Sequence, residues 1–115
     1  MKPVAHYITV SNMKASLDLY AQVFQQQPDH VDDRYSWFEI EGFAFGLLSS
    51  DFESREVIYG NAAAMCFLVE DIEAEYARLK NIVPKIDDEL LELPTVRIFQ
   101  FNDLDGNLIK VFQRR

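Results

Sequence analysis

The chain has 115 residues, of which 49% are hydrophobic, and its 19 acidic and 11 basic residues give a formal net charge of −8. This length and apolar content suit an ordinary core, so we expect one domain over residues 1–115. A negative field repels phosphate backbones and anionic lipid headgroups, which excludes nucleic acid and membranes as predicted partners. The N-terminus shows no apolar signal segment and the single cysteine cannot pair internally, so we expect a cytoplasmic protein.

The first half of the chain opens with a predicted strand and helix. Residues 3–10 alternate, with Ile8 on one face and Tyr7 on the other, and a period of two indicates a strand. Asn12 is a favourable N-cap for a helix that must end before Pro28. The apolar stripe that we expect this helix to bury consists of Met13, Leu17, Tyr20 and Phe24.

A hairpin is predicted to follow the helix. The polar stretch 29–34 is expected to be an exposed edge strand or a loop. Alternating residues then predict strands over 35–41 and 43–49. Glu41 and Gly42 between them suit a tight two-residue turn.

The second half repeats this plan after a charged connection over 51–61. An apolar strand is again followed by a capping Asx residue, Asp71 in the role of Asn12, and by an amphipathic helix. Further expected elements are strands over 83–86, 95–101 and 107–113, an acidic loop over 87–94 and a turn at 103–106. The prediction is therefore an α+β chain of two tandem βαβββ modules, about 1–55 and 62–115, whose curved mixed sheet encloses a cleft.

Two stretches of sequence resemble a known superfamily. The run His-Tyr-Ile-Thr-Val-Ser-Asn-Met from His6 leads into Ser-Leu-Asp-Leu-Tyr from Ser16, and an Asp-Leu-Asp-Gly-Asn turn begins at Asp103. These runs look like the vicinal oxygen chelate superfamily, which includes glyoxalases, extradiol dioxygenases, fosfomycin-resistance enzymes and bleomycin-resistance proteins. The resemblance implies a paired βαβββ fold with a small-molecule cleft, and a homodimer.

The same resemblance points to four positions where metal-using members carry their ligands. On this sequence they are occupied by Ala5, Gly46, Ala64 and Lys110. Alanine and glycine have no donor atom, and a lysine ammonium repels a divalent cation. We therefore expect no metal and no cofactor.

Side chains in the cleft-facing phase are the candidate ligand contacts. Aromatic rings there would hold a flat part of a ligand, and Glu39, Gln100 and Lys110 would orient it, which suits a planar or cationic guest. The aromatic residues are about equally consistent with an ordinary core. The predicted ligand-binding residues are Tyr7, Thr9, Trp37, Glu39, Leu48, Cys66, Ile98, Gln100, Lys110 and Phe112.

Three other features favour structural roles. His6 shares its face with Ile8, so we expect a hydrogen-bonded histidine beneath the helix unless a bulge turns it into the cleft. Cys66 has apolar neighbours and is expected to be a small buried hydrophobe. The turn that starts at Asp103 lacks the glutamate of a calcium loop, and a hairpin turn with glycine at positive φ accounts for it better.

Three functions stay open at this point. The leading one is a metal-free protein that binds and sequesters a drug-like or metabolite molecule, similar to the bleomycin-resistance branch. The second is a metal-dependent glyoxalase-like lyase, isomerase or dioxygenase with an unusual ligand set such as His6 with Glu39. The third is an effector-sensing or interaction subunit without activity of its own.

Overall fold

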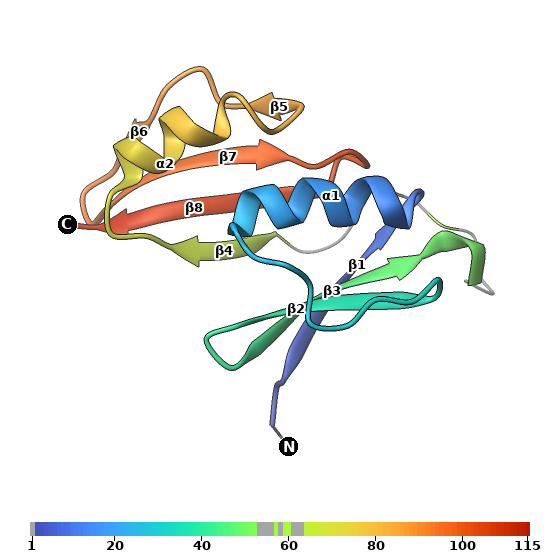
Figure 1. Cartoon of the computed structure of the whole chain (residues 1–115). Helices are drawn as coiled ribbons and strands as arrows, with labels where there is room; N and C mark the ends of the chain where they lie inside the picture. The colour runs from blue at the N-terminus through green and yellow to red at the C-terminus, as the bar shows by residue number, and fades with distance from the viewer. Residues whose placement is uncertain (1, 53–56, 58, 61–63) are drawn as a thin grey trace. The chain divides into compact units, whose positions relative to one another are not determined.

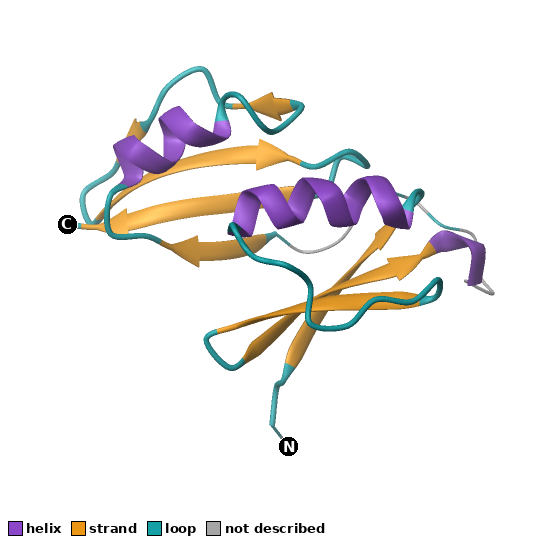
Figure 2. Ribbon diagram, viewed as in Figure 1, coloured by secondary structure: helices purple, strands orange, loops and turns teal. Residues whose placement is uncertain are grey.

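The computed structural model of the chain has two helices and two mixed sheets (Figures 1 and 2). It describes residues 2–52, 57, 59–60 and 64–115. The chain divides into two compact units, Met1–Tyr59 and Gly60–Arg115, each holding one helix and one sheet. The predicted α+β class with two modules is confirmed, although the strands form two separate sheets. Most of the expected connection over 51–61 lies outside the described residues.

The first unit is built on a three-stranded sheet in the order β1-β3-β2. Strand β1 is parallel to β3, and β2 is antiparallel to β3. The helix α1 joins β1 to β2, and a short 3₁₀ turn, η1, follows β3. These elements are β1 (Ala5–Val10), α1 (Met13–Phe24), β2 (Tyr35–Ile40), β3 (Phe43–Ser49) and η1 (Ser50–Phe52).

Local chemistry sets the boundaries of these elements. The Asn12 side chain accepts a hydrogen bond from the Ala15 N–H at 3.0 Å, which confirms it as the N-cap of α1. At the other end, Gln25 adopts a left-handed conformation that stops the helix. Glu41 and Gly42 both have positive φ (51° and 80°), the geometry of a tight hairpin turn between β2 and β3.

The core of the first unit lies between α1 and one face of the sheet. The Tyr20 and Phe45 rings lie 4.8 Å apart, and Phe24 meets Phe38 edge-on at 5.3 Å. The predicted helix stripe was only half right, because the side of α1 that is most buried consists of Ser16, Leu19, Tyr20 and Val23. Small Ser16 permits a close approach to the sheet, while Met13 and Leu17 are half-buried and face segment 27–33 instead.

The segment before β2 pairs with that strand at one point. His30 and Trp37 form an isolated antiparallel bridge, in which the Trp37 N–H donates to the His30 carbonyl at 3.0 Å. No further strand is assigned to residues 25–34, all of which the structure describes. The first module is therefore βαββ, with a single bridge in segment 29–34, where an edge strand or a loop was expected. The polar residues of this segment have no apolar face to bury.

The second unit repeats the plan around a five-stranded sheet. Its main order is β4-β8-β7-β5, and β6 pairs with β7. The strand predicted at 83–86 is shorter than expected, and the acidic loop at 87–94 contains β6, which we did not predict. The elements are β4 (Met65–Leu68), α2 (Ile72–Leu79), β5 (Lys85–Ile86), β6 (Leu91–Glu92), β7 (Val96–Asn102) and β8 (Leu108–Arg114).

The second unit has the same capping and packing chemistry. The Asp71 side chain caps α2 by accepting the Ala74 N–H at 3.1 Å. Beneath the helix lie buried Phe99 and Phe101. Between β7 and β8 the buried carboxylate of Asp103 accepts the N–H groups of Asp105 and Asn107, both at 2.9 Å, and Gly106 has φ of 81°. The predicted glycine-containing hairpin turn is confirmed. Among the described residues, no helix is long and apolar enough to cross a membrane.

Candidate functional site

The face of the first sheet that points away from α1 carries three rows of side chains. Strand pairing puts Tyr7, Gly46 and Trp37 in the middle row. On one side of that row is Ala5-Ala44-Glu39, and on the other is Thr9-Leu48-Tyr35. All five predicted ligand contacts of the first half, Tyr7, Thr9, Trp37, Glu39 and Leu48, therefore lie on this one face.

Glycine at the centre of this face makes room for an aromatic ring. A Cβ atom added to Gly46 would lie 2.6 Å from Cζ of Tyr7 and closer still to Cδ2 and Cε2. The Tyr7 ring therefore lies directly over the Gly46 backbone. Partial burial, and secondarily the neighbouring Tyr35, raise the pKa of the Tyr7 hydroxyl, so this ring stays neutral above its ordinary range.

Three further rings stack beside this position. The His30 ring lies on Trp37 with centroids 4.2 Å apart and an interplanar angle of 13°, and Tyr35 is 5.2 Å from His30. Asp32 holds the histidine, because its Oδ2 is 2.7 Å from His30 Nε2. A backbone N–H bond from Tyr35, followed by the His30 contact, lowers the pKa of Asp32. Offset aromatic contacts of this kind make a rigid platform.

Next to Tyr7 and Trp37 the surface is hollowed. An open cavity of about 360 Å³ is lined by Tyr7, Trp37 and Glu39, with Val4, Ala5, Gly42 and Ala44. Glu39 is the only charged residue among the described residues that line it. Its backbone is held from both sides, since its N–H donates to Asp29 Oδ2 at 2.6 Å and its carbonyl accepts from Gln26 Nε2 at 3.1 Å. Within the described chain its carboxylate has no partner, so one negative charge stands beside two aromatic rings.

The other five predicted contacts lie on one face of the second sheet. Lys110 is paired with Cys66 on β4 and with Gln100 on β7, which makes one row. Phe112 pairs with Leu68 and Ile98 in the next row, and the Arg114 guanidinium lies 5.9 Å from the Phe112 ring centroid. Cys66 is exposed rather than buried as predicted, because β4 is a short edge strand whose alternate side chains face outward.

Sequence reasoning missed His30 as part of the aromatic platform. We expected it on the surface, but it is half-buried against Trp37. Two features of the sequence pointed toward this contact: the alternation from Tyr35 to Trp37, and the possible edge strand at 29–34. They were not enough to predict it, because the imidazole reaches the indole only when His30 pairs with Trp37 in a β-bridge.

The comparisons with known proteins agree with this architecture. A model of the Glyoxalase/Bleomycin resistance protein/Dioxygenase superfamily matches residues 3–111. The chain belongs to this superfamily. A search among curated proteins found no match.

Solved structures share this fold at low sequence identity. A lactoylglutathione lyase from Agrobacterium tumefaciens has a TM-score of 0.79 at 14% identity, over 97% of this chain and 92% of that one. TioX from Micromonospora sp. ML1 has a TM-score of 0.74 at 15% identity, over 100% of both chains. A second Agrobacterium tumefaciens protein, solved by NMR, reaches 0.87 at 19% identity over 100% and 98%.

The residues of this superfamily member do not fit the metal that its metal-using relatives hold. Ala5 and Ala64 offer no donor atom, and Lys110 is a cation. At Gly46 the space in front of the strand is occupied by the Tyr7 ring. The chemistry of these four residues therefore does not suit a divalent ion.

His6 does not complete a metal site together with Glu39. In β1 it alternates with Tyr7 and so lies on the helix side of the sheet, opposite to Glu39. Two residues on opposite faces of a sheet cannot bind the same ion. The Nε2 atom of His6 is buried and has no hydrogen-bond partner in the described chain. We expected a hydrogen-bonded histidine on this side of the sheet, and the β1 register places it there, but its Nε2 atom lacks the hydrogen bond in the described chain.

Proposed function

We propose that this chain binds a small organic molecule without the help of a metal ion, similar to the bleomycin-resistance proteins of its superfamily. The observation that carries the proposal is the Tyr7 ring over Gly46, which puts an aromatic surface where a metal ligand would otherwise stand. Aromatic faces beside a hollow are what flat ligands use. Binding and sequestration need no further chemistry from these residues.

The proposed ligand is planar and carries a positive charge. Tyr7 and Trp37 supply ring surface. The carboxylate of Glu39, which has no partner among the described residues, supplies the complementary charge at the edge of the same hollow. A cation next to aromatic rings also gains from their quadrupoles. Thr9 and Leu48 extend this face, and we propose further ligand contacts from Cys66, Ile98, Gln100, Lys110 and Phe112.

Intrinsic fluorescence tests the proposal directly, because Trp37 is the only tryptophan. Proflavine, a planar cation, should quench Trp37 emission in a saturable way, while the planar anion 2-naphthalenesulfonate should bind far more weakly. Glu39→Gln should weaken proflavine binding about fivefold, as for loss of one partly exposed charge contact. Glu89→Gln is the matched control, since Glu89 is an exposed carboxylate in the other unit.

Three results would contradict the proposal. Equal affinity for the cation and the anion, or an unchanged affinity in Glu39→Gln, would remove the assigned role of Glu39. A stoichiometric divalent ion in metal analysis of the purified protein would overturn the metal-free part and favour a lyase, isomerase or dioxygenase. We also propose a homodimer, which light scattering tests by mass; a stable association with a different protein would instead favour an interaction subunit.

A further inference from the structure

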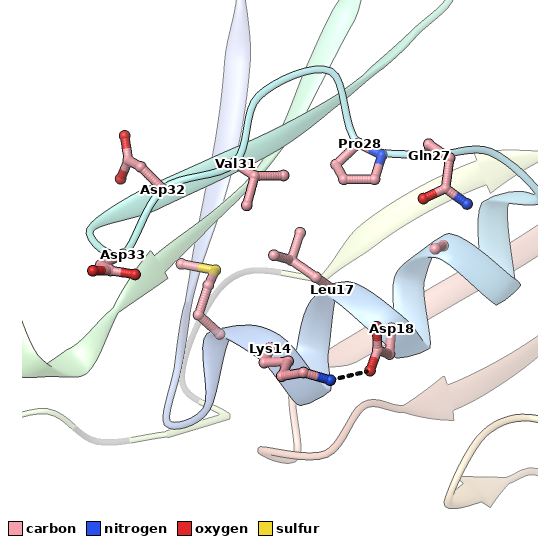
Figure 3. Close-up of a pocket in the computed structure, with 10 residues that line it drawn as sticks. Lys14, Leu17, Asp18, Gln27, Pro28, Val31, Asp32 and Asp33 are labelled. Atoms are coloured by element: carbon pink, nitrogen blue, oxygen red, sulfur yellow. Dashed lines mark ion pairs between the residues drawn. The ribbon is translucent and has the colours of Figure 1, made fainter.

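A second candidate surface lies between α1 and segment 27–33 of the first unit. A hollow of about 320 Å³ separates the helix from segment 27–33. Its apolar lining includes Met13, Leu17, Pro28 and Val31. In Figure 3 the Leu17 and Val31 side chains face each other across this space. Val31 is 58% exposed, so the groove keeps apolar surface in water.

Carboxylates surround one end of this apolar groove. A second hollow, of about 440 Å³, shares Met13 and Asp33 with the first and is also lined by Ser49 and Asp51. Asp32 lies on the rim of the first hollow. The two hollows together form one surface with an apolar half and an acidic half.

The net charge of this surface is negative. Lys14 and Asp18 form an ion pair at 3.6 Å on the helix, so they cancel each other (Figure 3). Asp32 stays ionised at neutral pH, because backbone N–H groups and His30 lower its pKa. Asp33 and Asp51 are exposed, and their carboxylates have no ion-pair or hydrogen-bond partner in the described part of the chain.

We propose that this surface docks a short segment of a partner protein in which an arginine stands next to a large apolar residue. The apolar hollow is at the small end of ligand cavities and suits one bulky side chain. An arginine has an apolar stem that can lie along Met13 and a planar head that pairs with carboxylates such as Asp33 and Asp51. Charge complementarity selects this partner, and the proposal is independent of any ligand at Tyr7 and Trp37.

NMR titration of the ¹⁵N-labelled full chain tests the docking site. The probe is the capped peptide Ala-Arg-Leu-Leu-Arg-Ala, with control peptides that carry Glu for Arg or Ala for Leu. We expect amide shifts at Leu17, Val31 and Asp33, and much smaller shifts with both control peptides. The double variant Asp33→Asn/Asp51→Asn should weaken binding about tenfold, roughly threefold for each carboxylate. The matched control Asp88→Asn alters an exposed acid in the other unit and should leave binding unchanged.

Each alternative outcome overturns the proposal. Shifts that are independent of the peptide's charge would mean nonspecific apolar contact. Shifts at these amides that rise with protein concentration alone would assign the groove to a second copy of this chain. Equal shifts with free arginine amide would assign it to a small cation. Shifts confined to Trp37 and Glu39 would place the peptide in the other hollow, and the absence of any shift at millimolar peptide would remove the site.

Discussion

Replacing Gly46 with alanine is the sharpest test of how the open face of the first sheet is built. The new methyl group would lie 2.6 Å from Cζ of Tyr7 and closer to two other ring carbons. Carbon atoms in contact prefer about 3.5–4.0 Å, so the ring must retreat by roughly 1 Å or more. Overpacking of this kind costs about 1–3 kcal/mol of unfolding free energy.

The sign of the effect should reverse when Tyr7 is removed. Gly46 has no positive φ in this structure, so alanine fits its backbone and reduces the entropy of the unfolded chain. In a Tyr7→Ala background, Gly46→Ala should therefore stabilise the fold by about 0.4–1 kcal/mol. The double-mutant cycle should give a coupling energy of about 1.5–4 kcal/mol between the two positions.

Urea denaturation followed by far-ultraviolet circular dichroism measures all four proteins of the cycle. The slope of free energy against urea must stay constant for the comparison to hold. If Gly46→Ala is neutral in the parent protein, the ring does not lie over the glycine. A penalty that persists after Tyr7→Ala would place its cause in the backbone of β3, and the reasoning about this face would then be wrong.

Three other predictions test packing, pH dependence and the buried Nε2 atom of His6. Phe101→Ala should lower the free energy of unfolding, measured by urea denaturation, by about 3–5 kcal/mol. Leu17 is half-buried, so Leu17→Ala should lower it by only about 1 kcal/mol. Equal losses in the two variants would contradict the observed orientation of α1. The pKa of Asp32 is lowered in the fold, so its stabilisation is present at neutral pH and is lost as pH falls below about 4. Asp32→Ala should therefore lower the melting temperature more at pH 7 than in acid, and Asp33→Ala should not change the melting temperature at either pH. His6→Leu removes a buried nitrogen without a hydrogen-bond partner and should stabilise the fold by about 0.5–1 kcal/mol; a loss of stability would show that the imidazole is paired.

Periodicity predicted most of the elements because local chemistry settles them. Alternation placed Tyr7 and Trp37 on one side of the first sheet, and the buried side chains of Ile8 and Phe38 confirm the opposite phase. Capping residues marked where both helices begin. The errors fell where neighbouring segments compete, as at Leu17, which belongs to a helix with one side on the sheet and another on a loop.

In the candidate site, too, residue types could be predicted from the sequence, whereas contacts between distant segments could not. The lack of metal donors at Ala5, Gly46 and Lys110 was visible in the residue types. The stack of His30 on Trp37 was not, since it depends on a bridge between two segments whose pairing has no sequence signal. The exposure of Cys66 likewise depends on β4 being an edge strand, which is a property of strand order.

The amino-acid sequence alone determined the order of the elements, the face on which each strand residue lies and the residue types available for chemistry. These properties follow from backbone geometry and side-chain composition, which act over a few neighbouring residues. Only the tertiary structure decided that Tyr7 covers Gly46, that the Glu39 carboxylate has no partner among the described residues, and that carboxylates gather around Asp33. Contacts of this kind join residues distant in the chain, and they form only after the strands have taken a register and the helix has packed on the sheet.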